Sequence, residues 1–222
     1  EYPRGGVFNT GGELAEAVAT TDVARTGNYS ARMTIRGASE KKLAVRLMRW
    51  GNKAWDDGDS KGLPEKAYYS AWYYFPKTYK PKSWWNIFQF KSTRDGETGK
   101  QSQAIWTLNI DSEKEAMWLY LYSKFNAPHS YSQQIPKTRI NLPVCQWVHI
   151  EALYEHSTTD TGRIAVWQDG VLLYDIKNVQ TAIGATVTWG IGNYTDHIKP
   201  ETATIYVDDA AIATERLWID KN

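Results

Sequence analysis

Five polar residues in this chain have the types and the spacing for proton-transfer chemistry, namely Gln89, Lys91, Asn109, Tyr120 and Tyr122. One residue separates Gln89 from Lys91 and Tyr120 from Tyr122, so each pair would share one face of a β-strand. A lysine amine can accept a proton when burial or a nearby positive charge lowers its pKa. A phenol can donate and accept a proton at one oxygen, and an amide can bind a carboxylate.

These groups suit elimination on a polymer of uronic acids. That reaction needs a group that neutralises the sugar carboxylate, a base for the neighbouring proton and an acid for the leaving oxygen. The two amides and a nearby arginine could neutralise the carboxylate, Lys91 could be the base, and Tyr122 or Tyr120 could be the acid. The sequence therefore favours an acidic polysaccharide as the substrate.

Hydrolysis of a glycosidic bond would instead require two carboxylates that flank the bond. The acids closest to this pattern are Asp111, Glu113 and Glu115. Ser112 and Lys114 lie between them, where a buried catalytic strand would carry apolar residues. We therefore expect a solvated hairpin turn here rather than a glycosidase site.

Segments of alternating apolar and polar residues, bounded by Gly, Pro, Asn and Asp, recur along the chain and predict an all-β fold. Asp169-Gly170 between two such segments predicts a two-residue hairpin, because both residues tolerate a positive φ. Short helices are predicted near 13–18 and 52–57. The predicted strands are 29–36, 42–50, 68–75, 85–91, 104–110, 117–125, 147–155, 163–168, 171–176 and 205–213.

Alternation also separates a core side from a polar side in three of these strands. Phe88 and Phe90 are expected in the core, whereas Ile87 is expected on the polar side with Gln89 and Lys91. A polar side can simply be the solvated face of an antiparallel sheet. Agreement across three strands, with no carboxylates and many amides and tyrosines, favours a binding surface for an acidic chain. The other expected core residues are Ala104, Trp106, Leu108, Ile110, Met117, Leu119, Leu121 and Phe125.

The aromatic composition is unusual, with 11 Trp and 14 Tyr against 5 Phe. Trp and Tyr carry a polar group on a flat apolar body, which suits surfaces that stack on sugar rings. A non-catalytic carbohydrate-binding module, in which Trp84, Trp85 and Trp118 stack on sugars, is therefore an alternative to an enzyme. An adhesion or glycan-recognition domain would use the same kind of surface.

The charge balance argues against several partners. With 26 basic and 25 acidic residues, the net charge is +1, and no basic tract is present to follow a nucleic-acid backbone. No apolar run has the length of a membrane helix. We expect a single soluble domain over residues 1–222, monomeric and free of nucleic acid and membrane.

The ends and special residues suggest an exported protein. The chain begins at Glu1 without an initiator Met, which indicates a processed product that is secreted to the extracellular space. Cys145 is the only cysteine, so disulfides and a cysteine zinc site are excluded, and we expect it to be buried. Asn28 and Asn193 each begin an Asn-x-Ser/Thr sequon.

Further residues are candidates for contacts with the substrate. Trp118 and Lys124 fall on the same face as the two tyrosines, and Asn109 falls on the polar face of the strand 104–110. His129 lies beside Tyr131 in the long loop 126–144, which we expect to line a cleft together with the loop 92–103. A surface role without substrate contact is the alternative for this histidine. The four histidines have no metal-ligand spacing, so transition-metal catalysis is not expected.

Several motifs occur together in this chain. They are Gly27-Asn28-Tyr29-Ser30-Ala31-Arg32, the aromatic segment 68–76, Asn86-Ile87-Phe88-Gln89-Phe90-Lys91, Trp118-Leu119-Tyr120-Leu121-Tyr122, and the segment 147–170 with its final Val-Trp-Gln-Asp-Gly. Together they resemble the concanavalin A-like jelly-roll polysaccharide lyases, which include the heparin-lyase-like group and families 14 and 20, acting on alginate and glucuronan. The resemblance implies a β-sandwich of two antiparallel sheets with a concave side that faces the carbohydrate.

The same resemblance implies roles for individual residues. In family 14 enzymes a lysine on a Gln-x-Lys strand is the base, and a Tyr-x-Tyr pair lies on a later strand. Lys91 with Tyr120 and Tyr122 matches this pattern residue by residue. Many heparin-lyase-like relatives carry His where Lys91 stands. Arg46 and Arg94 are the candidates for the arginines that neutralise the substrate in this family.

Tyr206-Val207-Asp208-Asp209 resembles the closing strand of many carbohydrate-binding jelly rolls, in which an aspartate helps to hold a structural calcium ion. Calcium prefers oxygen ligands of this type. The resemblance therefore implies a structural Ca²⁺ held by Asp208 and Asp209, with Glu13 as a further ligand. A pair of exposed acids without an ion is the alternative.

Two hypotheses remain. The leading one is a secreted lyase that cleaves a uronic-acid polysaccharide of the glucuronan or alginate type by β-elimination. The other is a non-catalytic carbohydrate-binding module on the same scaffold.

Overall fold

The computed structural model describes residues 5–39, 41–50, 63–97 and 101–217, and this part of the chain consists of β-strands and loops with a 3-10 turn, η1 (Gly12–Leu14). No helix in these ranges could span a membrane. The strands are β1 (Gly5–Thr10), β2 (Ala15–Thr20), β3 (Ser30–Ile35), β4 (Leu43–Trp50), β5 (Lys66–Tyr74), β6 (Lys80–Pro81), β7 (Trp85–Thr93), β8 (Gln103–Glu113), β9 (Ala116–Ser123), β10 (Ser130–Tyr131), β11 (Trp147–Glu155), β12 (Gly162–Gln168), β13 (Val171–Val179), β14 (Thr186–Thr195), β15 (Ile198–Lys199) and β16 (Ala203–Ala213).

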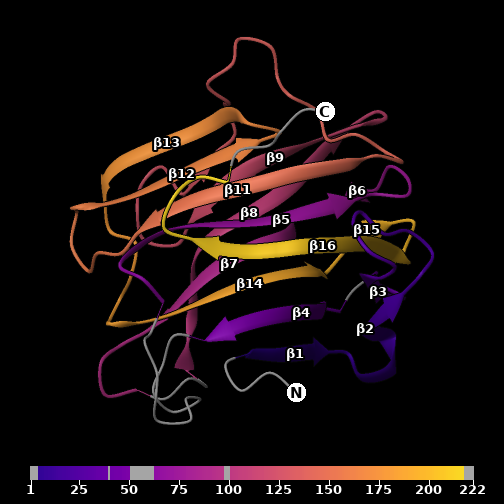
Figure 1. Cartoon of the computed structure of the whole chain (residues 1–222), viewed down its shortest axis with the longest axis horizontal. Helices are drawn as coiled ribbons and strands as arrows, with labels where there is room; N and C mark the ends of the chain where they lie inside the picture. Colours follow the sequence, from indigo (N-terminus) through magenta and orange to yellow (C-terminus); the bar gives the residue numbers. More distant parts are fainter. Residues whose placement is uncertain (1–4, 40, 51–62, 98–100, 218–222) are drawn as a thin grey trace.

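The long strands form two antiparallel sheets (Figure 1). The first sheet has the strand order β1-β4-β14-β7-β8-β9-β10, and the second has the order β13-β12-β11-β5-β16-β3-β2. In Figure 1, β7, β8 and β9 of the first sheet lie behind β5 and β11 of the second. β6 and β15 pair separately. The expected all-β sandwich is confirmed.

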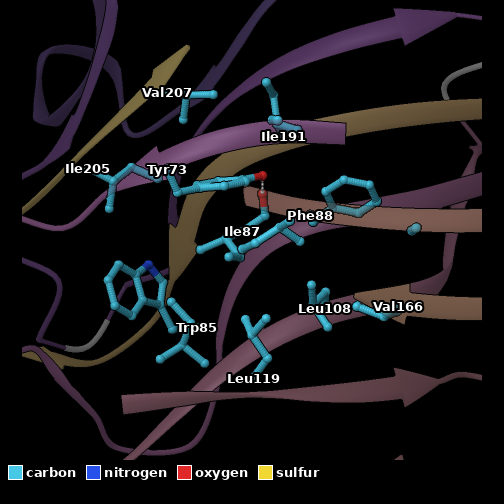
Figure 2. Packing of buried hydrophobic residues seen from close by; sticks show 14 of the residues in the cluster. Tyr73, Trp85, Ile87, Phe88, Leu108, Leu119, Val166, Ile191, Ile205 and Val207 are labelled. Atoms are coloured by element: carbon cyan, nitrogen blue, oxygen red, sulfur yellow. Dashed lines mark hydrogen bonds between the residues drawn. The ribbon is translucent and has the colours of Figure 1, made fainter. Parts of the chain in front are cut away.

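Apolar side chains from both sheets meet between them. Trp85 and Tyr73 are fully buried, and Phe90 is 1% exposed. Figure 2 shows the Tyr73 hydroxyl directed at the carbonyl of Ile87, to which it donates a hydrogen bond of 3.0 Å. A phenol buried in an apolar core needs such an acceptor, because an unpaired polar group there is costly. This bond links β5 of the second sheet to β7 of the first.

Most local predictions are confirmed. Each predicted strand overlaps an observed one. Asp169 and Gly170 form the β12–β13 hairpin with φ values of 48° and 79°. The acidic cluster around Lys114 (φ 55°) is the expected hairpin between β8 and β9.

The helix predicted near 13–18 is wrong. These residues form η1 and the start of β2, because pairing with β3 satisfies their backbone groups within the sheet. The helix predicted near 52–57 lies outside the described residues. β14 has no counterpart among the predicted strands, since Gly190 and Gly192 interrupt its alternating pattern.

Two of the core assignments are wrong. Ile87 is fully buried in the core, because a register shift between Asn86 and Phe88 breaks the simple alternation of β7. Phe125 is 38% exposed, since it follows the end of β9 and no longer obeys the strand pattern. Ala104 is only half-buried. The remaining residues of the expected set are at most 2% exposed, namely Phe88, Phe90, Trp106, Leu108, Ile110, Met117, Leu119 and Leu121.

Cys145 was expected to be buried and is exposed. It has a positive φ of 56° in the loop before β11, and its backbone N–H donates to the carbonyl of Phe75 at 2.8 Å. The tight backbone path of this loop, rather than side-chain hydrophobicity, decides the position of the thiol.

Asn193 on β14 joins the two sheets. Its side chain is fully buried, and its Oδ1 accepts a hydrogen bond of 2.9 Å from the Trp85 indole. Its Nδ2 donates to the carbonyls of Met33 on β3 at 3.1 Å and Ala203 on β16 at 2.8 Å. The sequon at Asn193 is therefore inaccessible in the folded chain, whereas Asn28 is exposed.

We expect Asn193→Ala to lower the free energy of unfolding by about 2–4 kcal/mol, because each buried polar group left unpaired costs about 1–3 kcal/mol. Urea denaturation followed by tryptophan fluorescence measures the difference. Asn28→Ala, at the exposed sequon, is the control and should leave stability unchanged. A loss below about 1 kcal/mol in Asn193→Ala would contradict the role given to this amide.

Candidate active site

The outer face of the first sheet brings the predicted polar residues together in rows across the strands. Gln89 on β7 pairs with Thr107 on β8, which pairs with Tyr122 on β9. In the adjacent row, Asn109 on β8 pairs with Tyr120 on β9. Directly opposed residues have Cβ atoms about 5 Å apart, and diagonal neighbours are within reach of long side chains. One continuous surface therefore carries both amides and both phenols.

Lys91 lies on the same side of β7, between Thr188 of β14 and Ala104 of β8. Its pKa is lowered from 10.5, first by burial and then by the positive charge of Arg46. Among the described residues, no carboxylate forms an ion pair with Lys91. A lysine in these surroundings gives up its proton more readily and can act as a base.

Arg46 on β4 is the cation whose positive charge, after burial, lowers the pKa of Lys91. Its guanidinium lies over the ring of Tyr194, 4.9 Å from the ring centroid. Its Nε is buried without a hydrogen-bond partner, and burial lowers its pKa. No carboxylate in the described part of the chain pairs with it. A half-buried guanidinium in this state can bind a ligand carboxylate.

The two tyrosines differ in their surroundings. The pKa of Tyr120 is raised to about 12, first by burial and then by the charges of Asp111 and Tyr122, so its hydroxyl stays protonated at neutral pH. Tyr122 is 38% exposed, with its ring centroid 6.5 Å from that of His129. His129 Nδ1 lies 3.1 Å from the carbonyl oxygen of Ser123, to which it donates. The structure thus places His129 beside Tyr122 at the edge of the candidate site, a neighbour that the sequence did not predict.

Two other cations predicted to bind substrate have partners of their own. Arg94 follows the end of β7, is exposed and lies 3.9 Å from the carboxylate of Glu97. The Lys124 ammonium donates to the side-chain oxygen of Gln103 at the edge of the same face. Arg46 is therefore the better candidate for neutralising a substrate carboxylate.

The expectation that Trp118 stacks on substrate is wrong for this structure. Its side chain is 5% exposed, because the long loop after β9 returns over it and places the Arg139 guanidinium 3.9 Å from the ring centroid. Gln134 in the same loop hydrogen-bonds the backbone of Ile140 at 2.7 Å and so helps to hold this path. Trp85 is also unavailable for stacking because it is fully buried.

The expected calcium ligands do not come together. Glu13 lies in η1 before Ala15, which is at the Ile35 end of β3, whereas Asp208 and Asp209 follow Val207 at the Ala31 end. Asp208 accepts hydrogen bonds from the backbone of residues 25 and 26, and Asp209 binds the side chains of the same two residues. Within the described ranges, no group of three His, Cys, Asp or Glu side chains could hold a metal ion. The contacts of Asp208 and Asp209 therefore indicate that these two aspartates hold the loop before β3 rather than a calcium ion.

Sequence reasoning missed four residues that border the site. Met48, Tyr194, Gly190 and Gly192 all lie on the outer face of β4 or β14. Arg46 and Met48 are two apart in a predicted strand, which could have placed them on one face. The other three belong to the unpredicted β14.

His149 is a buried histidine on the outer side of the second sheet. Its ring centroid lies 4.9 Å from that of Trp72. Its pKa is lowered to about 4, first by burial and then by the positive charges of Arg25 and Arg216. It is neutral at pH 7 and belongs to the sheet that does not carry Lys91, so it is not part of the candidate site.

Comparison with solved structures shows which known proteins share this fold. The endo-β-1,4-glucuronan lyase from the fungus Trichoderma reesei superposes with a TM-score of 0.69 at 15% identity, covering 94% of this chain and 90% of that one. The cellulose-induced protein Cip1 gives a TM-score of 0.61 at 15% identity, with 96% and 93% covered. The alginate lyase vAL-1 from a Chlorella virus gives 0.54 at 13% identity, with 94% and 90% covered. At such identities these similarities show a shared fold.

Sequence comparison identifies the family. No curated protein sequence matches this chain. Residues 8–211 match the family described as polysaccharide lyase. The matched range includes strands of both sheets and every residue of the candidate site. The chain therefore belongs to the polysaccharide lyase family.

Proposed function

We propose that this polysaccharide lyase cleaves a uronic-acid-containing chain by β-elimination on the outer face of the first sheet. The observation that carries the proposal is the pair formed by Lys91 and Arg46. Both are half-buried, burial and then the positive charge of Arg46 lower the pKa of Lys91, and neither has a carboxylate partner among the described residues. A partly desolvated cationic site without a carboxylate partner favours the binding of an anion, which supplies the missing counter-ion.

Each chemical step has a candidate group. Arg46, with the amides of Gln89 and Asn109, would hold the sugar carboxylate and stabilise the negative charge that develops on it. The Lys91 amine would take the proton from the carbon next to that carboxylate. The electron pair left behind forms a carbon–carbon double bond as the neighbouring carbon–oxygen bond breaks. Tyr120 would then give its proton to the leaving oxygen.

The substrate class follows from the unpaired charges. An uncharged sugar would leave Lys91 and Arg46 without a counter-ion, whereas a uronate supplies one carboxylate in each acidic residue. The glucuronan lyase and the alginate lyase that share this fold are named for acidic polysaccharides, which supports the same class here. We propose a glucuronan or an alginate as the first substrates to test.

The alternative of a non-catalytic module has little support from the structure. Its stacking surface was to include Trp85 and Trp118, and both are buried. Trp84 is half-buried, with its ring centroid 4.6 Å from that of Tyr194. A flat exposed platform of these three rings is therefore absent from the described part of the chain.

We also propose that the enzyme acts outside the cell as a monomer. A large polar polymer outside the cell does not cross a membrane unaided, so an enzyme that cleaves such a polymer has to act where the polymer is. Calcium stays a prediction without assigned ligands, since Asp208, Asp209 and Glu13 do not form one cluster.

Incubation with glucuronan and alginate should produce a rise in ultraviolet absorbance from the new carbon–carbon double bond. We expect Lys91→Ala to lower kcat by about 10²–10⁴-fold, the usual contribution of a general base. Lys177→Ala is the matched control, because Lys177 is an exposed lysine of the second sheet, 3.4 Å from Asp175. Equal activity in the two variants would refute the role of Lys91.

Tyr120→Phe should reduce kcat more than Tyr122→Phe. Tyr120 is the more buried phenol, and its pKa of about 12 keeps its hydroxyl protonated at neutral pH, which suits the group that protonates the leaving oxygen. Tyr122, 38% exposed, is better placed to contact the substrate, so its loss should act mainly on KM. Steady-state kinetics of both variants test this, and the opposite ranking of kcat would exchange the two roles.

The pH profile of kcat/KM should rise with pH toward a midpoint below 10.5. Only the neutral amine of Lys91 can take a proton, and its lowered pKa moves the neutral form to lower pH. Tyr120 adds no falling limb until its own pKa of about 12. A rate that falls between about pH 7 and 9, in enzyme shown by fluorescence to stay folded, would exclude a lysine base.

A further inference from the structure

β14 runs between β4 and β7 in the middle of the first sheet and has glycine at two successive outward positions. Gly190 pairs with Met48 on one side and Gln89 on the other, and Gly192 pairs with Arg46. Glycine weakens a strand interior because it has no side chain to pack. Two of them in a central strand therefore call for a local reason.

The reason is not backbone conformation. Neither Gly190 nor Gly192 is among the glycines with positive φ, so an L-residue could adopt the same backbone. The reason is the space above them. A Cβ at Gly190 would overlap the Met48 sulfur and lie 3.0 Å from its Cε, and a Cβ at Gly192 would lie 2.5 Å from the Arg46 Cγ and 2.7 Å from the Val45 carbonyl oxygen.

The side chains that occupy this space come from β4 and lie across β14 toward β7. The Met48 sulfur lies 3.7 Å from Gln89 Nε2. The Arg46 guanidinium lies over Tyr194, and its charge acts on Lys91. Residues on β4 thus act on β7, although a whole strand separates the two.

We propose that Gly190 and Gly192 are positioning residues of the lyase site, whose missing side chains let Met48 contact Gln89 and let Arg46 lie over β14 against the ring of Tyr194. The proposal rests on the function proposed above and deepens it. It makes the glycines responsible for where the substrate carboxylate binds relative to the base. It also explains why Arg46 has a buried Nε without a partner, since its path is set by the sheet and not by an ion pair.

Few charged or titratable groups near Lys91 could set its pKa. Its direct neighbours on β14 and β8, Thr188 and Ala104, do not titrate. Of the described strands further away, β4 contributes Arg46, β8 contributes Asp111, and β9 contributes Tyr120 and Tyr122, with Lys124 directly after its end. Arg46 is the one of these charges that acts on the Lys91 pKa, and its effect adds to that of burial.

Gly192→Ala is the decisive substitution. It should displace Arg46 and lower kcat/KM by about 10²-fold, the loss expected when a catalytic group moves by about 1 Å. Departure of the guanidinium should also raise the Lys91 pKa, so the rising limb of the pH profile should move to higher pH. Arg46→Gln should move the limb in the same direction.

Gly162→Ala is the matched control. Gly162 is a strand glycine of the second sheet whose added Cβ would lie 2.7 Å from the Val179 carbonyl oxygen. It should destabilise the fold by a comparable mechanism without moving the pH profile. Thermal unfolding of both variants shows how much of any activity loss comes from unfolded protein.

A readout independent of activity is the titration of Lys91 by NMR in protein with ¹³C-labelled lysine, assigned with Lys91→Ala. A higher Lys91 pKa in Gly192→Ala and in Arg46→Gln, but not in Gly162→Ala, supports the positioning role even if no tested polysaccharide is cleaved. An unchanged Lys91 pKa in Gly192→Ala overturns it, even if the wild type is an active lyase.

A second pair of variants covers the case in which an added methyl group prevents folding. Gly190→Ala/Met48→Ala removes the side chain that the new Cβ would meet, so it should regain the stability lost in Gly190→Ala. We expect its kcat/KM to equal that of Met48→Ala, with Gln89 released in both. A double variant as unstable as Gly190→Ala would show that these glycines serve backbone packing alone.

Discussion

The buried amide of Asn193 determines where β14 lies, and the rest of the site depends on the position of that strand. Its three hydrogen bonds reach Trp85, Met33 and Ala203, on β7, β3 and β16. A polar group in a dry core must be paired, so these strands have to meet at one relative position for the amide to be satisfied. The hydrogen bonds on the inner face of β14 therefore fix the position of this strand. That position sets which residues of β4 and β7, Arg46 and Gln89 among them, lie beside its outer face.

Electrostatics distinguish the two outer faces of the sandwich. On the second sheet, Arg163 binds Asp175 at 2.7 Å, and Arg216 binds Glu151 at 2.7 Å. On the first sheet, no described carboxylate pairs with Lys91 or Arg46. Cations that already have carboxylate partners gain little from an acidic polymer, whereas partly buried unpaired cations gain a counter-ion. This difference is the reason for proposing the first sheet as the face that binds a uronate.

Several features could not be read from the sequence, each for a specific reason. The loop that covers Trp118 closes by contacts of Arg139 and Gln134 with residues distant along the chain. The carboxylate of Asp208 accepts hydrogen bonds from a loop more than a hundred residues earlier in the sequence. A resemblance in the local sequence does not show that these carboxylate oxygens already have partners. Ile87 departs from its predicted side because of a local register shift, which a period of two cannot anticipate.

The sequence by itself determined the all-β class, most strands, and the shared face of Gln89 with Lys91 and of Tyr120 with Tyr122. A strand alternates with a period of two, so spacing alone assigns side chains to faces. Only the tertiary structure decided which strands become neighbours, and hence that the side chains of Met48 and Arg46 lie over Gly190 and Gly192. Glycine carries no pattern of its own, and a pKa depends on burial and on charges that folding brings from distant segments.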